Sequence, residues 1–225
     1  TPAPAATPKS GPGGQLSLFE SAAAGGEPAV ERVGTAPGYR VEVQVVDSPE
    51  KLAALVKSLE SAEAVAFDTE STSTDPLLAE LVGISLSVKA GQACYIPLGH
   101  RQGGGDLFGS NDLVAGQIPL DQALAALKPV LEDASILKIG QNMKYDWKIF
   151  VRHGIRITPF DDTMLMSYAM HAGLHNHGMD FLSEHYLDHT PIPIKSLLGS
   201  GKSQVTFDRV GIDDAVKYAA EDADV

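Results

Sequence analysis

Val65-Ala66-Phe67-Asp68-Thr69-Glu70 joins an apolar run to a pair of carboxylates. The apolar, β-branched and aromatic residues from Ala64 to Phe67 predict a buried strand. Because residues two apart in a strand project from the same face, Asp68 and Glu70 should lie side by side. Two like charges held together are unfavourable unless a cation lies between them, and oxygen ligands suit Mg²⁺ or Mn²⁺. The alternative is a strand that ends in a solvated Asp-Thr-Glu turn.

Hydrophobic periodicity along the chain predicts an α/β domain that begins near Tyr39. We expect strands at residues 41–45, 64–67, 81–88, 93–98 and 136–140, the third and fourth joined as a hairpin. We expect helices at residues 49–59, 120–133, 142–153, 162–172, 179–187 and 213–225. Pro129 should kink or break the second helix, and residues 192–207 should be irregular. Early strands followed by strands that alternate with helices indicate a mixed sheet flanked by helices.

Composition limits the classes of function that fit the chain. At 225 residues with 44% hydrophobic content, the chain can hold one sizeable domain and a tail. The formal net charge of −12 argues against tight, non-specific binding of duplex DNA through a basic face. No apolar run reaches the roughly 18 residues of a membrane helix. The single Cys94 cannot form an internal disulfide, which fits a reducing cytoplasm.

Residues 1–38 differ in composition from the rest of the chain. They are rich in Ala, Pro, Gly, Ser and Thr, so we expect a flexible interdomain linker. One apolar island interrupts it, Gln15-Leu16-Ser17-Leu18-Phe19. This pentad resembles the peptide by which bacterial replication and repair proteins bind the sliding clamp, and the alternative is an incidental apolar patch.

Two further motifs place polar side chains four residues apart on predicted helices. Asn142 and Asp146 should share one face at the start of a helix, and Tyr218 and Asp222 should share one face late in the last helix. Each pair alone would fit an ordinary solvated helix face. Together with the Asp68/Glu70 pair, and in this order, they form a much more specific pattern.

The set closely resembles the 3′–5′ exonuclease domain of the DNA polymerase I family, which belongs to the DEDD exonucleases. The likeness runs from about Val43 to Val225 and includes the stretches at 138–146 and 218–225. It implies a ribonuclease H-like fold, with residues 39–225 as a C-terminally truncated exonuclease domain. It also implies a preceding 5′-nuclease domain, a following polymerase domain and a bacterial, nucleoid-associated location in the cytoplasm.

The resemblance implies a role for each matched residue. Asp68, Glu70, Asp146 and Asp222 would hold two divalent ions, Mg²⁺ or Mn²⁺, that act on the last phosphodiester of a DNA 3′ end. Tyr218 would orient the attacking water through its hydroxyl, because a phenol with a pKa of about 10 is too weak a base at neutral pH.

Contacts with the substrate are also implied by the resemblance. Gln141, Asn142, Thr69 and Thr74 should lie along the single strand near the scissile end. Relatives carry a larger apolar residue at the position of Thr74 and an aromatic residue in the segment that is Pro-Ile-Pro-Ile at 191–194 here. We therefore expect weaker binding of single strands and a high apparent KM, with catalysis intact.

Two other functions fit the same fold. One is a docking or spacer module that keeps the fold without the chemistry, although all four carboxylates and the tyrosine are present. An RNA-trimming DEDD exonuclease would show the same motifs, while the flanking sequence favours the polymerase-linked DNA enzyme.

Overall fold

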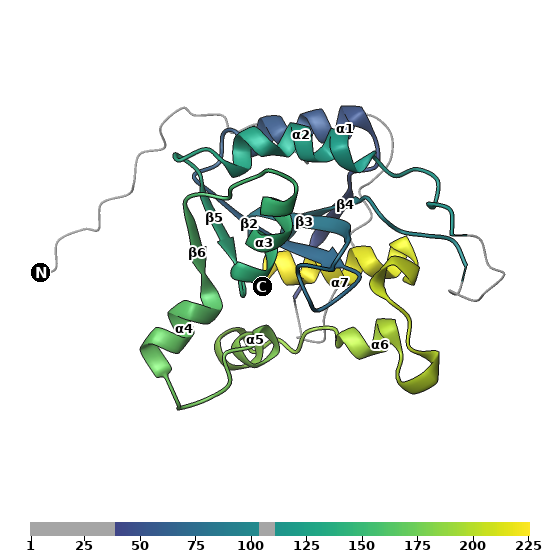
Figure 1. Cartoon of the computed structure of the whole chain (residues 1–225). Coiled ribbons are helices and arrows are strands. Elements are labelled where there is room, and N and C mark those ends of the chain that lie inside the picture. Colours follow the sequence, from purple (N-terminus) through teal and green to yellow (C-terminus); the bar gives the residue numbers. More distant parts are fainter. Residues whose placement is uncertain (1–38, 104–110) are drawn as a thin grey trace, which may run out of the picture.

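In the computed structural model, which describes residues 39–103 and 111–225, six strands form one mixed sheet (Figure 1). Their order is β1-β4-β3-β2-β5-β6. The strands are β1 (Glu42–Val45), β2 (Ala64–Ser71), β3 (Leu81–Lys89), β4 (Gln92–Pro97), β5 (Leu137–Gly140) and β6 (Phe160–Asp162). Neighbours β4, β3 and β2 are antiparallel, whereas β1–β4, β2–β5 and β5–β6 are parallel. The predicted mixed α/β sheet is confirmed.

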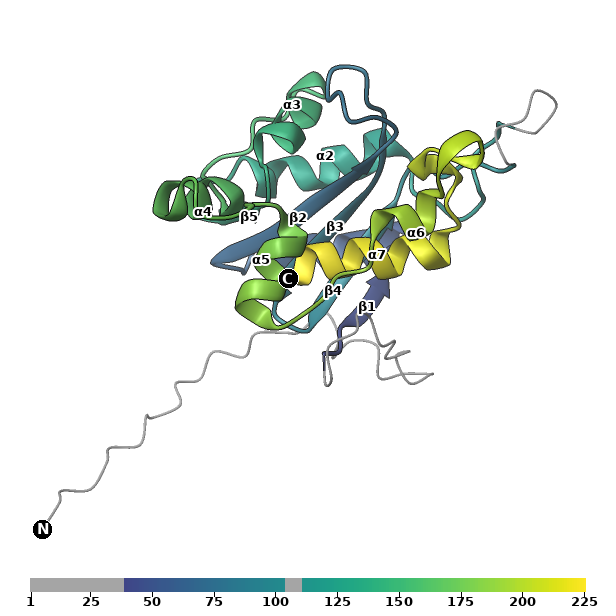
Figure 2. The same cartoon turned by 90° about the horizontal axis from the view of Figure 1, so that it is seen from below.

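Helices cover both faces of this sheet. The helices are α1 (Pro49–Leu59), α2 (Leu120–Leu131), α3 (Lys144–Arg152), α4 (Thr163–His171), α5 (Met179–Leu187), α6 (Ile194–Leu198) and α7 (Ile212–Asp224). Helices α1 and α2 pack together over one face, and α7 crosses the other face against β2, β3 and β4 (Figure 2). Helices α5 and α6 lie on the α7 side of the sheet.

The alternation of side chains along β2 determines which of its residues point to each face of the sheet. Val65 and Phe67 are buried in the main core, where the Phe67 ring meets the edge of Phe150 from α3 at 5.9 Å between centroids. A second cluster on the opposite face packs Tyr95 of β4 against Val216 of α7. Residues of even number at the end of β2 therefore face α7, and the odd-numbered ones face α3.

The local patterns predicted most element positions within two residues. Strands β3 and β4 form the expected hairpin, whose turn contains Gly91 at φ 80°, a conformation that glycine adopts without strain. Helix α1 begins as expected, because the Ser48 hydroxyl accepts a hydrogen bond from the Lys51 amide and Pro49 occupies the first turn.

Four expectations about the elements differ from the structure, and one strand was not expected. The strand expected to end at Phe67 continues to Ser71, because pairing with β3 extends past the carboxylates. Of the kink or break expected at Pro129, the break is absent, because helix α2 runs through this residue to Leu131. Helix α3 begins at Lys144, because Asn142 has the left-handed φ of 60° and cannot be helical. The segment 192–207 contains α6 and two 3₁₀ turns, and β6 was not predicted.

The N-terminal tail precedes Tyr39, the first residue that the structure describes. The pentad Gln15 to Phe19 and the expected linker 1–38 fall outside the described residues. Within the described part of the chain, no helix has the length and apolar character needed to span a bilayer.

Candidate active site

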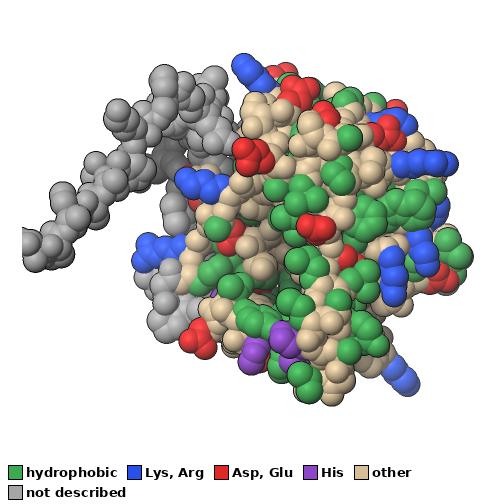
Figure 3. Space-filling model, turned by 90° about the vertical axis from the view of Figure 1, so that its left-hand side faces the viewer, with side chains coloured by type: hydrophobic (Ala, Val, Ile, Leu, Met, Phe, Trp, Pro, Cys, Tyr) green, Lys and Arg blue, Asp and Glu red, His purple; other side chains and the backbone are tan. Residues whose placement is uncertain are grey.

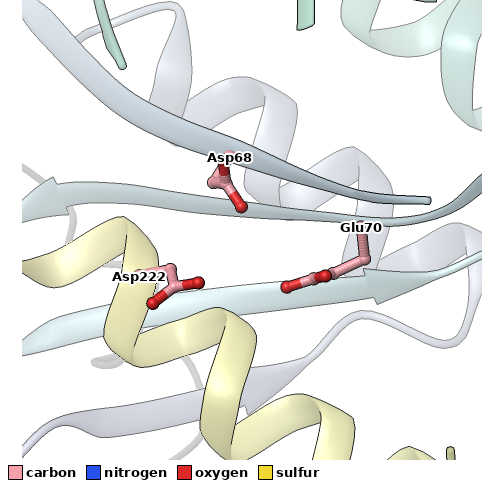
Figure 4. Close-up of side chains that lie close together, drawn as sticks. All are labelled: Asp68, Glu70 and Asp222. Atoms are coloured by element: carbon pink, nitrogen blue, oxygen red, sulfur yellow. The ribbon is translucent and has the colours of Figure 1, made fainter. Parts of the chain in front are cut away.

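Three carboxylates converge where β2 passes under α7. Asp68 and Glu70 project from the same face of β2, and Asp222 projects toward them from α7 (Figure 4). One oxygen from each residue can be chosen so that all three lie within 4.8 Å of one another. The two-residue spacing in the strand and the crossing of α7 together create this acidic group.

The environment of this group opposes negative charge. Burial raises the pKa of Asp68, and burial followed by the charge of Asp68 raises the pKa of both Glu70 and Asp222. One oxygen of the buried Glu70, Oε1, has no hydrogen-bond donor among the described residues. An unsatisfied buried oxygen in a group of like charges is what a bound cation would compensate, so the donor set fits a divalent metal with oxygen ligands.

Tyr218 lies one helical turn before Asp222 on α7. Its hydroxyl donates a hydrogen bond to the Asp222 carboxylate. Burial, followed by the charges of Asp222 and Glu70, raises the pKa of Tyr218 far above its ordinary value. The phenol is therefore held protonated beside the three carboxylates, as a hydrogen-bond donor.

Asp146 reaches the site from the α3 side. Its carboxylate is not part of the group of three and instead accepts a hydrogen bond from the Thr69 hydroxyl. Burial, followed by the charge of Asp68, raises the pKa of Asp146. The Thr69 hydroxyl thereby positions Asp146, and the expected contact of Thr69 with the substrate stays a prediction.

The predicted residues share one open cavity of about 570 Å³. The residues of its lining that the sequence singled out are Asp68, Thr69, Glu70, Thr74, Gln141, Asn142, Asp146, Tyr218 and Asp222. Thr74 is exposed at the rim. The side-chain amide of Gln141 donates a hydrogen bond to the His177 carbonyl at 2.8 Å. The backbone amide of Asn142 donates one to the Asp162 carboxylate at 3.1 Å.

The cavity has an apolar wall that sequence reasoning missed. Met164, Met179, Ile194, Leu198 and Phe207 line it. Ile194 and Leu198 belong to α6, which lies in the segment expected to be irregular. The signal that was available is Pro193 directly before Ile194, with Leu197 and Leu198 following at the spacing of one helical face.

Tyr145 also lines the cavity, and the sequence did not indicate its position there. Its hydroxyl lies 2.5 Å from the Ser71 hydroxyl and donates to the Ser73 carbonyl. It thereby anchors the loop that carries Thr74 to α3, and so fixes one rim of the cavity.

A smaller cavity of about 340 Å³ opens on the other side of Asp68 and Asp222. Its lining is largely apolar and comes from α4 and α5, including the exposed Met166, Met170 and Leu187. Figure 3 shows apolar side chains and histidines gathered on this face of the molecule. The acidic group thus borders both cavities, and the smaller one has the more apolar lining.

Comparison with known proteins shows the family to which this chain belongs. Residues 43–225 match the family model for 3′–5′ exonucleases. The chain belongs to this exonuclease family. DNA polymerase I of Rhizobium leguminosarum is 54% identical over 170 residues, which are 72% of this chain and 17% of that protein. DNA polymerase I of Pseudomonas aeruginosa is 42% identical over 188 residues, 82% of this chain and 20% of that protein.

Solved structures relate the exonuclease to the ribonuclease H-like fold. The catalytic core of RRP6 from Trypanosoma brucei superposes with a TM-score of 0.61 at 17% identity, covering 86% of this chain and 46% of that one. RNase D of Escherichia coli, an exoribonuclease involved in structured RNA processing, gives 0.58 at 21% identity, covering 81% and 41%. The predicted fold class is confirmed. The exonuclease spans about a fifth of the length of the polymerases that it matches.

Proposed function

We propose that this chain is a metal-dependent 3′–5′ exonuclease that removes nucleotides from the 3′ end of single-stranded or frayed DNA. The observation that carries the proposal is the convergence of Asp68, Glu70 and Asp222 within 4.8 Å in the shared cavity. A buried and two half-buried like charges held together weaken the fold unless they serve a bound cation, and clusters with such raised pKa values gather at functional sites.

Two divalent ions, Mg²⁺ or Mn²⁺, fit this donor set. Asp68, Glu70 and Asp222 would hold one ion, and Asp68 with Asp146 would hold the other, directly or through water. When bound, such ions lower the pKa of water and stabilise negative charge on phosphate oxygens. The carboxylates would bind the ions and the ions would bind phosphate, which would let a chain of net charge −12 act on a polyanion.

The surrounding residues would place the substrate. The Tyr218 hydroxyl, held protonated, would orient the attacking water by a hydrogen bond and would not take its proton. The apolar wall formed by Ile194 and Leu198 would face the terminal base. Gln141 and Asn142 at the opposite wall would contact the strand, and Thr74 at the rim offers little stacking surface.

The place of the domain in a longer protein is also a proposal. The polymerases that match this chain are about five times longer, so we propose that residues 39–225 proofread for a covalently attached polymerase domain in the bacterial cytoplasm, at the nucleoid. Residues 1–38 would serve as an interdomain linker, and Gln15 to Phe19 would bind the sliding clamp.

One specific observation favours a second substrate. The fold is shared with RNase D of Escherichia coli, an exoribonuclease involved in structured RNA processing, and the carboxylate set does not distinguish the two sugars. RNA trimming is therefore the second candidate function. A catalytically degenerate docking module is the third, and the intact set of carboxylates argues against it.

Release of mononucleotides from labelled oligonucleotides tests these functions. Single-stranded DNA and RNA of one sequence would be incubated with Mg²⁺ or Mn²⁺, with and without excess EDTA, beside Asp68→Ala. Metal-dependent release from the 3′ end of DNA that Asp68→Ala abolishes supports the proposal. Faster release from RNA favours the second function, and binding without release favours the docking module.

A further inference from the structure

Glu221, the residue before Asp222, is fully buried and fully hydrogen-bonded. Its Oε1 accepts from Nε2 of His189 at 2.7 Å, and its Oε2 accepts from the backbone amide of Ile192 at 2.5 Å. The side chains of His189 and Glu221 are 1% and 0% exposed. This carboxylate therefore ties α7 to the connection between α5 and α6, which runs along α7 in Figure 2.

Asp224, two residues after Asp222, is anchored in a similar way. It accepts from the Tyr39 hydroxyl at 2.8 Å and from the Gly91 amide at 2.6 Å. The Tyr39 ring packs against the ring of His189, with centroids 4.0 Å apart. The two anchors are thus in contact with each other, and they hold the last turn of α7 on both sides of Asp222.

The hydrogen bonds of His189 show that Nε2 is the nitrogen that orients its ring. An ionised carboxylate only accepts, so Nε2 of His189 carries the hydrogen that it donates to Glu221. Its Nδ1 is buried and has no partner among the described residues. A buried ring nitrogen left unsatisfied is unfavourable, so the bond to Glu221 is what orients this ring.

We propose that His189 and Glu221 are positioning residues that hold Asp222 against Asp68 and Glu70 in the metal-binding geometry. Three like charges repel one another until a cation binds, and an unanchored last turn of α7 would move Asp222 away. The His189–Glu221 bond opposes that movement from the neighbouring residue of the helix, about 100° around its axis. This inference rests on the proposed function, because it assigns Asp222 to a metal site.

Two substitutions of His189 separate the hydrogen bond from packing. His189→Phe keeps a ring against Tyr39 and removes the donor, whereas His189→Gln places an amide nitrogen where Nε2 lies. We expect His189→Phe to weaken Mn²⁺ binding, measured by titration with electron paramagnetic resonance, and to raise the Mg²⁺ concentration for half-maximal nuclease activity. Loss of a partner bonded directly to a metal ligand changes such affinities by about 10- to 100-fold, and because His189 acts through the residue next to Asp222, we expect a change at the lower end, about tenfold. The KM for the oligonucleotide should stay within about twofold, and His189→Gln should restore most of the Mn²⁺ affinity.

A milder variant covers the case in which His189→Phe does not fold. Tyr39→Phe removes only the hydroxyl that bonds Asp224 and keeps the ring on His189. We expect a smaller loss of Mn²⁺ affinity in the same direction. Val130→Ala in α2, on the opposite face of the sheet, is the control for lowered stability alone.

The outcomes separate this inference from the proposed function. Mn²⁺ affinity that is unchanged in both His189→Phe and Tyr39→Phe, or reduced no more than in Val130→Ala, overturns the positioning role. A wild-type chain that binds Mn²⁺ and releases no nucleotide refutes the exonuclease. In that case the comparison of Mn²⁺ affinities among the variants still decides whether His189 positions Asp222.

Discussion

The hydroxyl of Thr69 donates a hydrogen bond to the carboxylate of Asp146, and so joins the end of β2 to the start of α3. Thr69 lies between Asp68 and Glu70, and its side chain points to the other face of the strand. The same three-residue segment therefore supplies two carboxylates to one side and positions a third from the other. Asp146 owes its place to this bond rather than to helix geometry alone.

Thr69→Val should disturb Asp146 while leaving the strand intact. Valine matches threonine in shape and suits a strand, but it leaves a buried carboxylate oxygen without its donor, at a cost of about 1–3 kcal/mol. We expect kcat to fall about tenfold or more, with KM for DNA nearly unchanged. Steady-state kinetics with a labelled single strand measures both. Thr69→Ser keeps the hydroxyl and should retain most of the activity; equal losses in both variants would contradict this role.

Asp222→Asn should abolish nuclease activity and raise the free energy of unfolding of the metal-free protein. Burial and mutual repulsion raise the pKa of each carboxyl in the acidic group, so removing one charge should raise the free energy of unfolding without metal by about 0.5–2 kcal/mol. The same substitution should abolish nuclease activity. Urea unfolding in EDTA at neutral pH measures the gain, which Mg²⁺ should reduce or reverse. A variant less stable than the wild type in EDTA would show that repulsion in this group is unimportant.

The same group gives metal-free stability a pH dependence of known sign. Burial raises the pKa of Asp68 from 3.8 to about 7, so folding takes up protons between these values. The stabilisation that protonation provides is complete at low pH and is lost as pH rises toward about 7. In EDTA, the unfolding free energy of the wild type should therefore fall more steeply across this window than that of Asp222→Asn. Parallel pH profiles for the two proteins would argue against raised pKa values.

The parts of the site that depend on local pattern were accessible from sequence. Alternation in β2 predicts that Asp68 and Glu70 share a face, and helical spacing relates Tyr218 to Asp222, which lies one turn later. The convergence of β2 and α7 required the family resemblance, because no local signal tells which helix crosses which strand. The catalytic roles of these residues stay a prediction until the enzyme is assayed.

Other features depend on contacts that are distant in sequence. His189 and Glu221 are 32 residues apart and meet because the connection that follows α5 lies against α7. The position of Asn142 outside α3 follows from its left-handed backbone, which the motif N-x-x-x-D does not reveal. Strand β6 is three residues long and polar, so it exists because β5 offers a free edge for pairing.

The pentad Gln15 to Phe19 makes a separate prediction about partners. Leu18 and Phe19 are large apolar residues in an otherwise small and polar segment, so they should supply most of the docking energy. Calorimetry measures the binding of the full chain to a bacterial sliding clamp. This binding should be lost when Leu18 and Phe19 are both replaced by alanine. Replacement of Thr7 and Ser10 by alanine is the matched control. Equal affinity of the two variants for the clamp would exclude the pentad as the docking peptide.

Ile194→Phe should strengthen the binding of single strands. Ile194 lies in the apolar wall of the cavity, in a segment without an aromatic residue, and stacking on one base is worth about 1–3 kcal/mol. We expect KM for a single-stranded oligonucleotide to fall about fivefold or more, with kcat nearly unchanged. Ile194→Leu adds no ring and should leave KM as it is. A wild-type KM that Ile194→Phe does not lower would mean that the terminal base lies elsewhere in the cavity.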